Sequence, residues 1–337
     1  MVKKQMSRIR RISLLVFLVK ILTAFCFSTL ADETFNEWLN SYKKFAISKG
    51  VSEKTINLVF KDVKYLSQVI KYDRKQPEFF EDTNTYVSKR ANSLRLKKAK
   101  QLYKKNQTLF EEIENKFKVD KEILLSLWGI ETNFGKHVGK MDIISSLATL
   151  SFDKRRRDFF STQLLILLKL IDKELVDPKT LFGSWAGAYG NFQFMPSTID
   201  NYAIDYDGNN KIELKTSLKD SLASAANYIN KIGWKMGEPC FYEVKITKKI
   251  KKKHMSSSAR KINYRIKTSK WKKKGVVKIK EDNFKKDLKA ALILPDDKAE
   301  SPAFLVFQNY EKILKWNRSL RFGISVCTLA NMIKDEI

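Results

Sequence analysis

Histidine and cysteine are scarce in this 337-residue chain. Its two histidines, His137 and His254, are too few for a histidine-rich metal centre, and they argue against a Ser-His-Asp triad. Of its three cysteines, Cys240 and Cys327 lie well inside the chain. Two cysteines do not make a disulfide framework, although they could pair in an oxidising compartment. The sequence leaves their pairing open.

Acidic residues are missing from the first 31 positions, which carry six lysines and arginines instead. An apolar run from Ile12 to Phe27 follows the basic start, and Thr29-Leu30-Ala31 then offers a cleavage site. This order predicts a secretory signal peptide over residues 1–31. We therefore expect a periplasmic protein whose signal peptide engages the membrane only during export.

A membrane anchor is the alternative interpretation of this first segment. The apolar run is short for a membrane span, and Lys20 interrupts it. A lipid anchor on Cys26 is not expected either, because Phe25 fills the preceding position, where a small residue is usual. Both observations favour cleavage over anchoring.

The formal net charge of +28 points to an anionic partner: nucleic acid, an acidic membrane surface, or an acidic polymer such as the cell wall. Removing the six basic residues of the signal peptide from +28 leaves +22. The lysine-rich run at 249–274 could be a nucleic-acid patch, but few aromatic residues interleave it. Since export also removes most nucleic acid from reach, we expect no nucleic-acid partner and an anionic cell envelope instead.

Hydrophobic periodicity predicts a mainly α fold, α+β overall, in four parts after the signal peptide. These are a helical N-terminal part (32–119), a core (120–242), a small basic β-containing lobe (243–301) and a C-terminal helical return (302–337). One helix is expected from Tyr86 to Phe110, and Asp120 is the predicted N-cap of another. Alternation from Val244 to Ile250 predicts a strand.

The segment 128–135 places Glu131 at the end of an apolar helix. Apolar neighbours desolvate a carboxyl group and favour its protonated form, as a general acid for glycosidic-bond cleavage requires. Alone the signal is weak, because a glutamate near a helix end is more often a surface or capping residue. A glycine-rich stretch at 183–198 adds hydrogen-bonding Ser184 and Gln193 beside aromatic residues, which suits a sugar. The alternative is a tightly packed loop around aromatic core residues.

Eight pieces of the chain together resemble the membrane-bound lytic murein transglycosylase B family. In order they are GIETNFG (129–135), LATLSFD (147–153), the arginines at 155–157, GSWAGAYGNFQFMPST (183–198), DYDGNN (205–210), LASAANYINKIGW (222–234), GEP (237–239) and PAFLVFQNYEKILKWNRS (302–319). They cover about residues 120–330. Because several pieces occur in family order, the match is far more specific than any single motif.

The resemblance implies a lysozyme-like catalytic core and a role for each matching residue. Glu131 matches the single catalytic acid/base of the family. The residues matched to the glycan-binding cleft are Arg155, Arg156, Ser184, Gln193, Tyr228, Asn317, Phe322 and, in a weakly similar region, Tyr86. The implied partners are peptidoglycan glycan strands, with no required cofactor. Wall-remodelling proteins are further candidate partners.

A single carboxylate has mechanistic meaning, because hydrolytic glycosidases generally use two. The resemblance implies that Glu131 acts twice, first as acid and then as base, and gives a 1,6-anhydro sugar without consuming water. Asp142 and Asp153 are the nearest other carboxylates in the motif segments, and we expect structural roles for them. Two alternatives remain: a lysozyme-like hydrolase, and a non-catalytic wall-binding protein in which Glu131 is idle. The joint presence of Glu131, Ser184 and Gln193 argues against the latter.

The segment 205–213 has oxygen ligands at alternating positions, as in a calcium loop. The candidate ligands are Asp205, Asp207, Asn209, Asp220 and the carbonyl of Lys211. Some members of the resembled family carry such a site, but here asparagines replace the turn glycine and an aspartate. An asparagine- and aspartate-rich turn without a metal is the alternative. The sequence predicts either a structural Ca²⁺ site or such a turn.

Overall fold

The computed structural model describes residues 34–75, 81–279, 284, 286–298 and 300–337. The predicted signal peptide and Cys26 lie outside these ranges. The chain divides at Tyr42 into two compact units. Within the described ranges, no helix combines the length and the apolar character that crossing a membrane requires.

Helix α2 (Phe35–Ser48) begins in the first unit, where Trp38 stacks on Phe35 at 5.8 Å and on Tyr42 at 5.1 Å between ring centroids. All other elements belong to the second unit, Lys43–Ile337.

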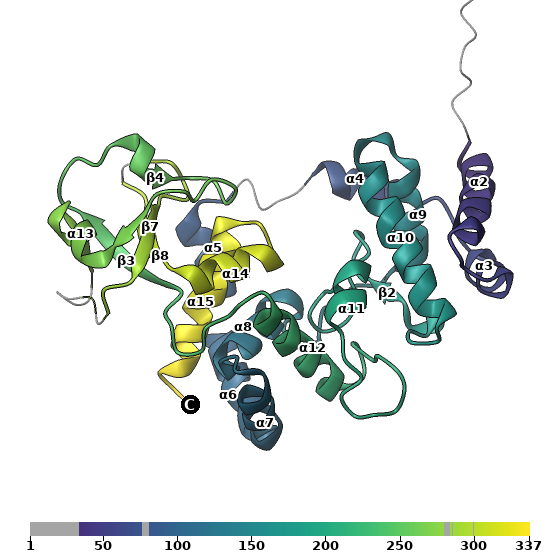
Figure 1. The fold of residues 1–337 in the computed structure, drawn as a ribbon, viewed down its shortest axis with the longest axis horizontal. Helices are drawn as coiled ribbons and strands as arrows, with labels where there is room; N and C mark the ends of the chain where they lie inside the picture. Colours follow the sequence, from purple (N-terminus) through teal and green to yellow (C-terminus); the bar gives the residue numbers. More distant parts are fainter. Residues whose placement is uncertain (1–33, 76–80, 280–283, 285, 299) are drawn as a thin grey trace, which may run out of the picture. The chain divides into compact units, whose positions relative to one another are not determined.

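The second unit is rich in helices, most of them in its first two thirds and at its end (Figure 1). The α-helices are α3 (Glu53–Phe60), α4 (Ser67–Arg74), α5 (Thr83–Arg90), α6 (Ser93–Lys105), α7 (Gln107–Phe117), α8 (Lys121–Thr132), α9 (Ile143–Phe152), α10 (Arg157–Asp172), α11 (Pro196–Tyr202), α12 (Leu218–Lys231), α13 (Thr268–Lys273), α14 (Gln308–Trp316) and α15 (Leu320–Lys334). Short 3-10 helices are η2 (Lys154–Arg156), η3 (Pro178–Thr180) and η4 (Lys252–His254).

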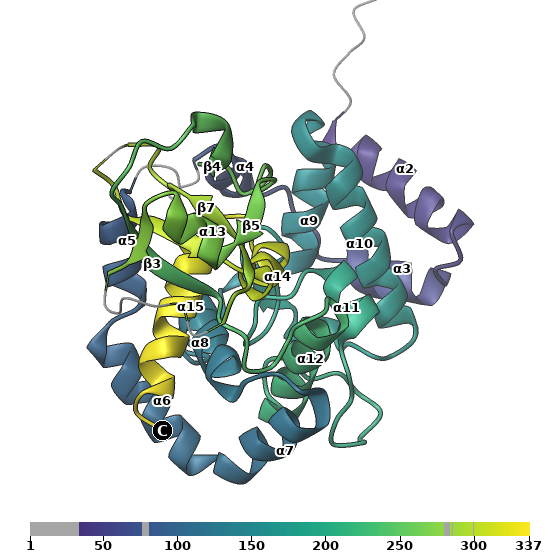
Figure 2. The same cartoon turned by 60° about the vertical axis from the view of Figure 1, so that its left-hand side comes forward.

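Helix α8 is buried on nearly every side, from Glu122 to Gly129, as expected for a helix that is apolar all round. The C-terminal helix α15 packs along it, and the two lie side by side in Figures 1 and 2. The Ser126 hydroxyl donates to the Val326 carbonyl at 2.6 Å, which satisfies a polar group inside this contact. The helix that ends at Glu131 is therefore a fixed central element.

The expected single helix from Tyr86 to Phe110 was wrong, since three helices, α5, α6 and α7, cover this region. The first ends at Arg90, and Asn92 then caps α6 by accepting a hydrogen bond from the Arg95 amide at 3.0 Å. Asn106 separates α6 from α7, and its side chain donates to the Leu102 carbonyl at 2.9 Å. Asparagine side chains compete with helix continuation in this way.

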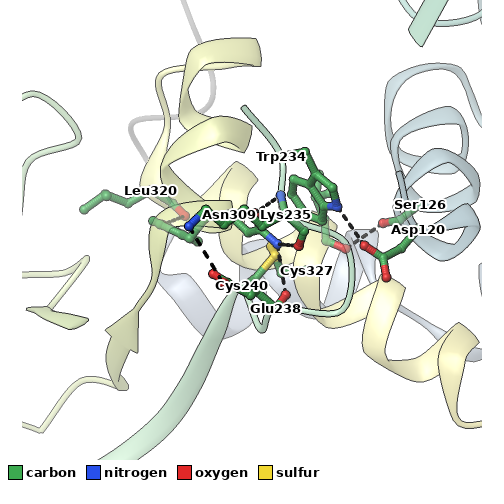
Figure 3. The surroundings of a disulfide bond; sticks show 11 residues. Asp120, Ser126, Trp234, Lys235, Glu238, Cys240, Asn309, Leu320 and Cys327 are labelled. Atoms are coloured by element: carbon green, nitrogen blue, oxygen red, sulfur yellow. Dashed lines mark hydrogen bonds and ion pairs between the residues drawn. A yellow bond between two sulfur atoms is a disulfide. The ribbon is translucent and has the colours of Figure 1, made fainter. Parts of the chain in front are cut away.

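Asp120 stands at the N-cap position of α8, but its side chain makes no capping bond. Its carboxylate accepts instead from the Trp234 indole at 2.7 Å and from the Gly237 amide at 3.0 Å (Figure 3). The predicted cap therefore links α8 to the segment that follows α12.

A mixed sheet forms a lobe between α12 and α14. Its strands are β3 (Phe241–Ile246), β4 (Met255–Ser256), β5 (Arg265–Lys267), β6 (Val276–Lys278), β7 (Lys289–Ile293) and β8 (Ala303–Val306). The order is β4-β7-β8-β3-β6, and β5 also pairs with β7. Trp271 of α13 is fully buried against this sheet and donates to the Ala290 carbonyl at 2.8 Å.

Two details of the lobe differ from expectation. Strand β3 ends at Ile246, four residues before the alternating pattern does. The stretch from Ala303, expected to be helical, begins with β8, which lies inside the sheet between β7 and β3. All four β8 residues are buried, and a strand buried on both faces shows no alternation.

Cys240 and Cys327 form a disulfide with their Cα atoms 6.0 Å apart (Figure 3). The bridge joins α15 to the residue before β3. Beside it, the Asn309 amide donates to the carbonyls of Lys235 and Glu238 at 2.7 and 3.0 Å. The start of the lobe is therefore fastened to the helical part by covalent and hydrogen bonds.

Candidate active site

Glu131 lies half-buried in the last turn of α8. The indole nitrogen of Trp316 donates to its carboxylate oxygen Oε1 at 2.9 Å. Trp316 is the last residue of α14 and stands 185 positions away in sequence. The sequence analysis quoted its WNRS element but gave a role only to Asn317, so it missed this contact. A tryptophan in a matched motif was the available signal.

The chain leaves α8 through a sharp left-handed turn at Asn133 (φ 51°) and Phe134 (φ 59°). The buried Asn191 braces this turn. Its side-chain oxygen accepts from the Trp128 indole at 3.0 Å, and its carbonyl accepts from the Thr132 hydroxyl at 2.8 Å. Asn191 therefore positions the helix end that carries Glu131, a role that the sequence analysis did not assign.

The backbone of the glycine-rich loop packs directly against the backbone of the segment that follows α8. Strands β1 (Met141–Asp142) and β2 (Phe182–Gly183) pair there. A Cβ added at Gly139 would lie 2.1 Å from the Gly183 carbonyl oxygen, so no larger residue fits. Close packing of backbone on backbone fits the alternative of a tightly packed loop, which the sequence left open beside a sugar site.

Ser184 and Gln193 hold the shape of this loop. The Ser184 hydroxyl accepts from the amides of Ala186 and Ala188 at 3.3 and 2.9 Å. Gln193 has a left-handed backbone (φ 51°), and its side-chain amide donates to the carbonyls of Val138 and Gly190 at 3.1 and 3.0 Å. Both residues are half-buried, and these polar contacts are with the protein itself.

An aromatic cluster lies beside Glu131. Tyr228 stacks on Trp316 at 5.1 Å and on Tyr202 at 4.5 Å, and Phe194 packs against Trp316 at 5.2 Å between ring centroids. The Tyr228 hydroxyl donates to the Lys315 carbonyl at 3.1 Å. Burial raises the pKa of Tyr228, so its hydroxyl remains a donor at neutral pH.

The structure thus brings Tyr228 and Trp316 together at Glu131. Asn317, half-buried, follows Trp316 directly and caps the end of α14.

The two predicted cleft arginines bind a buried aspartate. Asp73 of α4 is 3% exposed, and both Arg155 and Arg156 contact its carboxylate, with the Arg155 Nε at 2.7 Å. Beside them, Arg74 pairs with Asp153 at 2.8 Å. Asp73 therefore fixes the arginine pair and neutralises part of its charge, which the sequence analysis did not foresee.

Asp142 and Asp153 have the structural contacts that were expected. The Asp142 carboxylate accepts from the Ile144 amide at 2.9 Å and so caps α9. Asp153 accepts from the Arg155 amide at 3.3 Å in addition to its contact with α4.

Tyr86 and Phe322 are only 3% and 4% exposed. The Arg90 guanidinium lies 3.4 Å from the centre of the Tyr86 ring, and Phe322 belongs to the buried face of α15. Neither ring presents an open face on which a sugar could stack. These two residues could therefore affect glycan binding only indirectly, by supporting the side chains that pack against them.

The carboxylates of Asp205, Asp207 and Asp220 each offer an oxygen within 4.8 Å of the other two. Asp205 accepts from the Asn210 amide at 2.7 Å, and the fully buried Asp220 accepts from the Tyr206 amide at 2.9 Å.

The other two predicted ligands have different surroundings. The Asn209 side-chain oxygen accepts from the Lys211 amide at 2.9 Å, as in an Asx turn. Both residues are exposed. The three aspartates are therefore the stronger candidates for metal ligands.

Comparison with known proteins decides the family. Residues 34–331 match the family model described as the transglycosylase SLT domain. The chain belongs to this family. Over 121 residues it is 42% identical to the membrane-bound lytic murein transglycosylase B of Escherichia coli (strain K12), a match that covers 36% of this chain and 33% of that protein. The alignment thus spans about a third of that relative. The resemblance stated from the sequence is confirmed.

Solved structures show the same fold. SltB3 from Pseudomonas aeruginosa, in complex with NAG-NAM-pentapeptide, superposes with a TM-score of 0.83 at 31% identity, over 90% of this chain and 80% of that one. The Escherichia coli lytic transglycosylase Slt35, in complex with calcium, superposes with a TM-score of 0.75 at 23% identity, over 91% and 94% of the chains. The mainly helical, lysozyme-like fold with a small β-containing lobe is confirmed.

Proposed function

We propose that this protein is a lytic murein transglycosylase. It cleaves the β-1,4 bond between N-acetylmuramic acid and N-acetylglucosamine without water and leaves 1,6-anhydro-N-acetylmuramic acid ends. The observation that carries the proposal is Glu131, which accepts a hydrogen bond from Trp316 at the end of a buried helix. The same relative, SltB3, has also been solved with NAG-anhNAM-pentapeptide, which is the product class proposed here.

Glu131 acts in both steps of the proposed reaction. As an acid it gives its proton to the glycosidic oxygen, and the bond from that oxygen to C1 of the muramyl residue breaks. As a carboxylate it then takes the proton of the muramyl 6-hydroxyl, whose oxygen bonds to C1. The proton lost in the first step is regained in the second, so one carboxylate completes the cycle. The hydrogen bonds of Asp142 and Asp153 to structural partners fit this single-carboxylate scheme.

Mass spectrometry of the soluble products from purified sacculi tests the proposal. Muropeptides with anhydro ends are expected. Reducing ends would instead identify a hydrolase, and a folded protein that releases nothing would support a wall-binding role.

Trp316→Phe is expected to lower kcat by roughly tenfold to a hundredfold with little change in KM, since a hydrogen bond to a charged group contributes about 1.5–3 kcal/mol. The phenyl ring retains the aromatic packing but loses the N–H that orients Glu131. Steady-state kinetics on soluble glycan strands would measure both constants.

The matched control is Trp234→Phe, which removes an indole bond to Asp120 far from the chemistry. It is expected to retain kcat. An equal loss of kcat in both variants would mean that Trp316 only supports the fold.

The protein is further proposed to act in the periplasm after export. The Cys240–Cys327 disulfide supports this, because such bonds persist in oxidising compartments. The positive charge that is left after signal-peptide cleavage would attract the protein to an anionic cell wall. Peptidoglycan strands are the proposed partner, and nucleic acid is not.

A structural Ca²⁺ is proposed between Asp205, Asp207 and Asp220. Three carboxylates this close repel one another, and a divalent cation would relieve the repulsion. Asp205 and Asp220 already accept amide hydrogens, and Asp207 accepts from the Ser217 hydroxyl at 3.1 Å. These bonds orient the carboxylates, and each oxygen has a second lone pair for a metal.

Calcium at about a hundredfold excess over its Kd is expected to raise Tm by about 5 °C, which a chelator reverses. Asp207→Asn should lose this shift. The control Asp200→Asn, at an exposed position on α11, should retain it. A calcium-independent Tm in differential scanning calorimetry of the unmodified protein would leave the loop as a plain turn.

A further inference from the structure

The lysine-rich part of the lobe carries positive charge that the proposed reaction does not use. Residues 244–279 contain 13 lysines, two arginines and no aspartate or glutamate. Arg265 pairs with Glu311 at 2.6 Å, and Glu311 lies outside the segment. Lys267 pairs with Asp287 at 3.7 Å, which also lies outside it. A surplus of one sign on this scale favours binding to an anionic partner.

The fold gathers three of these lysines around His254. Burial, and then the charges of Lys274, Lys253 and Lys251, lower the pKa of His254, so all three ammonium groups act on one ring. Lys274 stands at the end of α13, whereas Lys251 and Lys253 belong to the turn of η4. The three side chains are exposed. We call Lys251, Lys253 and Lys274 the lysine cluster.

Aromatic and backbone contacts fix the two segments that carry the cluster. His254 stacks on Tyr264 at 4.0 Å, and Tyr264 packs edge-on against Trp271 of α13 at 5.6 Å between ring centroids. The Thr247 amide donates to the Gly275 carbonyl at 2.8 Å, which joins the residue after β3 to the end of α13. The lysine cluster is therefore a built feature of the lobe and not a chance meeting of two loops.

A small cavity of about 90 Å³ lies beside His254. Basic groups of Lys253, His254 and Lys261 line it, with polar groups from Ser256 and Asn263. No carboxylate is among the described residues that line it. The cavity is smaller than the roughly 300–1,000 Å³ of typical small-molecule sites, so it suits a single phosphate group and not a whole sugar. Ammonium groups are strong donors to phosphate oxygens.

The aromatic residues near the cluster do not form a surface for nucleic acid. Trp271 is fully buried, and Tyr264 lies between His254 and Trp271. Proteins that hold single-stranded nucleic acid combine positive charge with exposed rings on which bases stack, and these two rings do not offer that. The predicted export also removes most nucleic acid from reach.

An anionic lipid surface fits the cluster better. Lysine is a point charge on a flexible stem, which suits phosphates that are spread over a surface, whereas arginine favours paired contacts with one group. Lys252 and Lys273 adjoin the cluster in sequence and are exposed as well. With them the surface carries five exposed lysines, and clusters of about four to eight basic residues are typical of binding to anionic lipids.

We infer that the lysine cluster binds anionic phospholipid headgroups and so holds the protein, through its lobe, at a membrane surface beside the cell wall. One headgroup phosphate occupies the cavity at His254, and the surrounding lysines attract its neighbours. The contact is peripheral, because only side-chain ammonium groups meet the headgroups. The inference does not depend on Glu131, and it uses the proposed export only to set nucleic acid aside.

Co-sedimentation of the exported chain with lipid vesicles tests this inference. Vesicles of phosphatidylcholine alone would be compared with vesicles in which about a third of the lipid is phosphatidylglycerol. Binding is expected only to the anionic vesicles, and it should fall as salt rises, because salt screens exposed charges. Absence of binding to the anionic vesicles, or equal binding to both kinds, would overturn the inference.

Replacing Lys251, Lys253 and Lys274 together by glutamine is expected to weaken binding to the anionic vesicles by about a hundredfold. Each lysine close to such a surface contributes about fivefold to the binding constant, and three contributions multiply. Because all three side chains are exposed, the substitutions should not disturb the fold. Undiminished binding by this variant would refute the assignment of the surface.

The matched control removes the same charge from exposed positions on α6, where Lys97, Lys98 and Lys104 are each replaced by glutamine. It should bind the anionic vesicles within about twofold of the unmodified protein, since these lysines lie outside the proposed surface. An equal loss in the control would mean that net charge alone drives binding, and the cluster would then have no special role.

Lipid-free sacculi separate a membrane surface from a cell-wall surface. On sacculi the cluster variant should lose no more affinity than the α6 variant. A selective loss there without one on vesicles would assign the cluster to the cell wall and overturn the inference. Both variants should release anhydro products from soluble glycan strands at the normal rate. Failure of the proposed function would appear in that assay alone, since the vesicles contain no glycan.

Discussion

Glu131→Gln is expected to lower the rate of anhydro-muropeptide release by about a thousandfold or more, since positioned acid–base groups typically contribute 10²–10⁴-fold and this one acts in both steps. The amide can neither donate the required proton nor accept the one from the 6-hydroxyl. Its oxygen can still accept from the Trp316 indole, so the fold and substrate binding should be retained. Chromatography and mass spectrometry of sacculus digests would measure the rate.

Glu122→Gln is the matched control. It makes the same chemical change on the same helix, in the first turn, where the side chain pairs with Lys121 at 3.6 Å. It should retain the activity of the unmodified protein. Wall-lytic activity at the normal rate in Glu131→Gln would falsify the assignment of the acid, whatever the control shows.

The proposed role of Glu131 could be drawn from the sequence because its motif is local. Its place at the end of an apolar helix is a weak signal alone, and the seven other motif pieces in family order made the prediction specific. The glycine-rich loop was recognisable for the same reason, since a Cβ added at Gly183 would lie 2.2 Å from the Ala188 carbonyl oxygen. Local spacing carries such information well.

The partners of these residues could not be found in this way, because they are distant in sequence. The Trp316 indole reaches Glu131 across 185 positions, and Asp73 reaches Arg155 across 82. A sequence can mark an arginine pair, but it does not reveal which buried carboxylate will fold against it. The sequence therefore predicted two arginines available to the glycan, whereas in the structure both bind Asp73.

Short buried elements were the other source of error. Strand β8 has four consecutive buried residues and no alternation, so its apolar run could equally begin a helix. Only its pairing with β3 and β7 makes it a strand. The break at Asn92 was missed for a related reason, since one asparagine in a polar helix pattern is a weak signal until its capping bond is seen.

Replacing both Cys240 and Cys327 by alanine is expected to lower the free energy of unfolding by about 2–4 kcal/mol. The bridge joins cysteines that are 87 positions apart, and closing so long a loop restricts the unfolded chain strongly. That loop contains all the strands from β3 to β8. The bridge therefore fastens the residue before β3, where the lobe begins, to α15 (Figure 3). Urea denaturation monitored by circular dichroism would give the difference.

Reduced unmodified protein is the control that separates the bridge from the sulfur atoms. Both cysteines are buried, at 7% and 0% exposure, so alanine also removes packed volume. Reduction retains the sulfurs and breaks only the crosslink, and it should account for most of the loss. Neither change touches the bond between Trp316 and Glu131, so anhydro product should still form well below the new Tm. Identical urea midpoints for the oxidised and reduced proteins would show that the hydrogen bonds of Asn309 and Asp120 hold the lobe without the bridge.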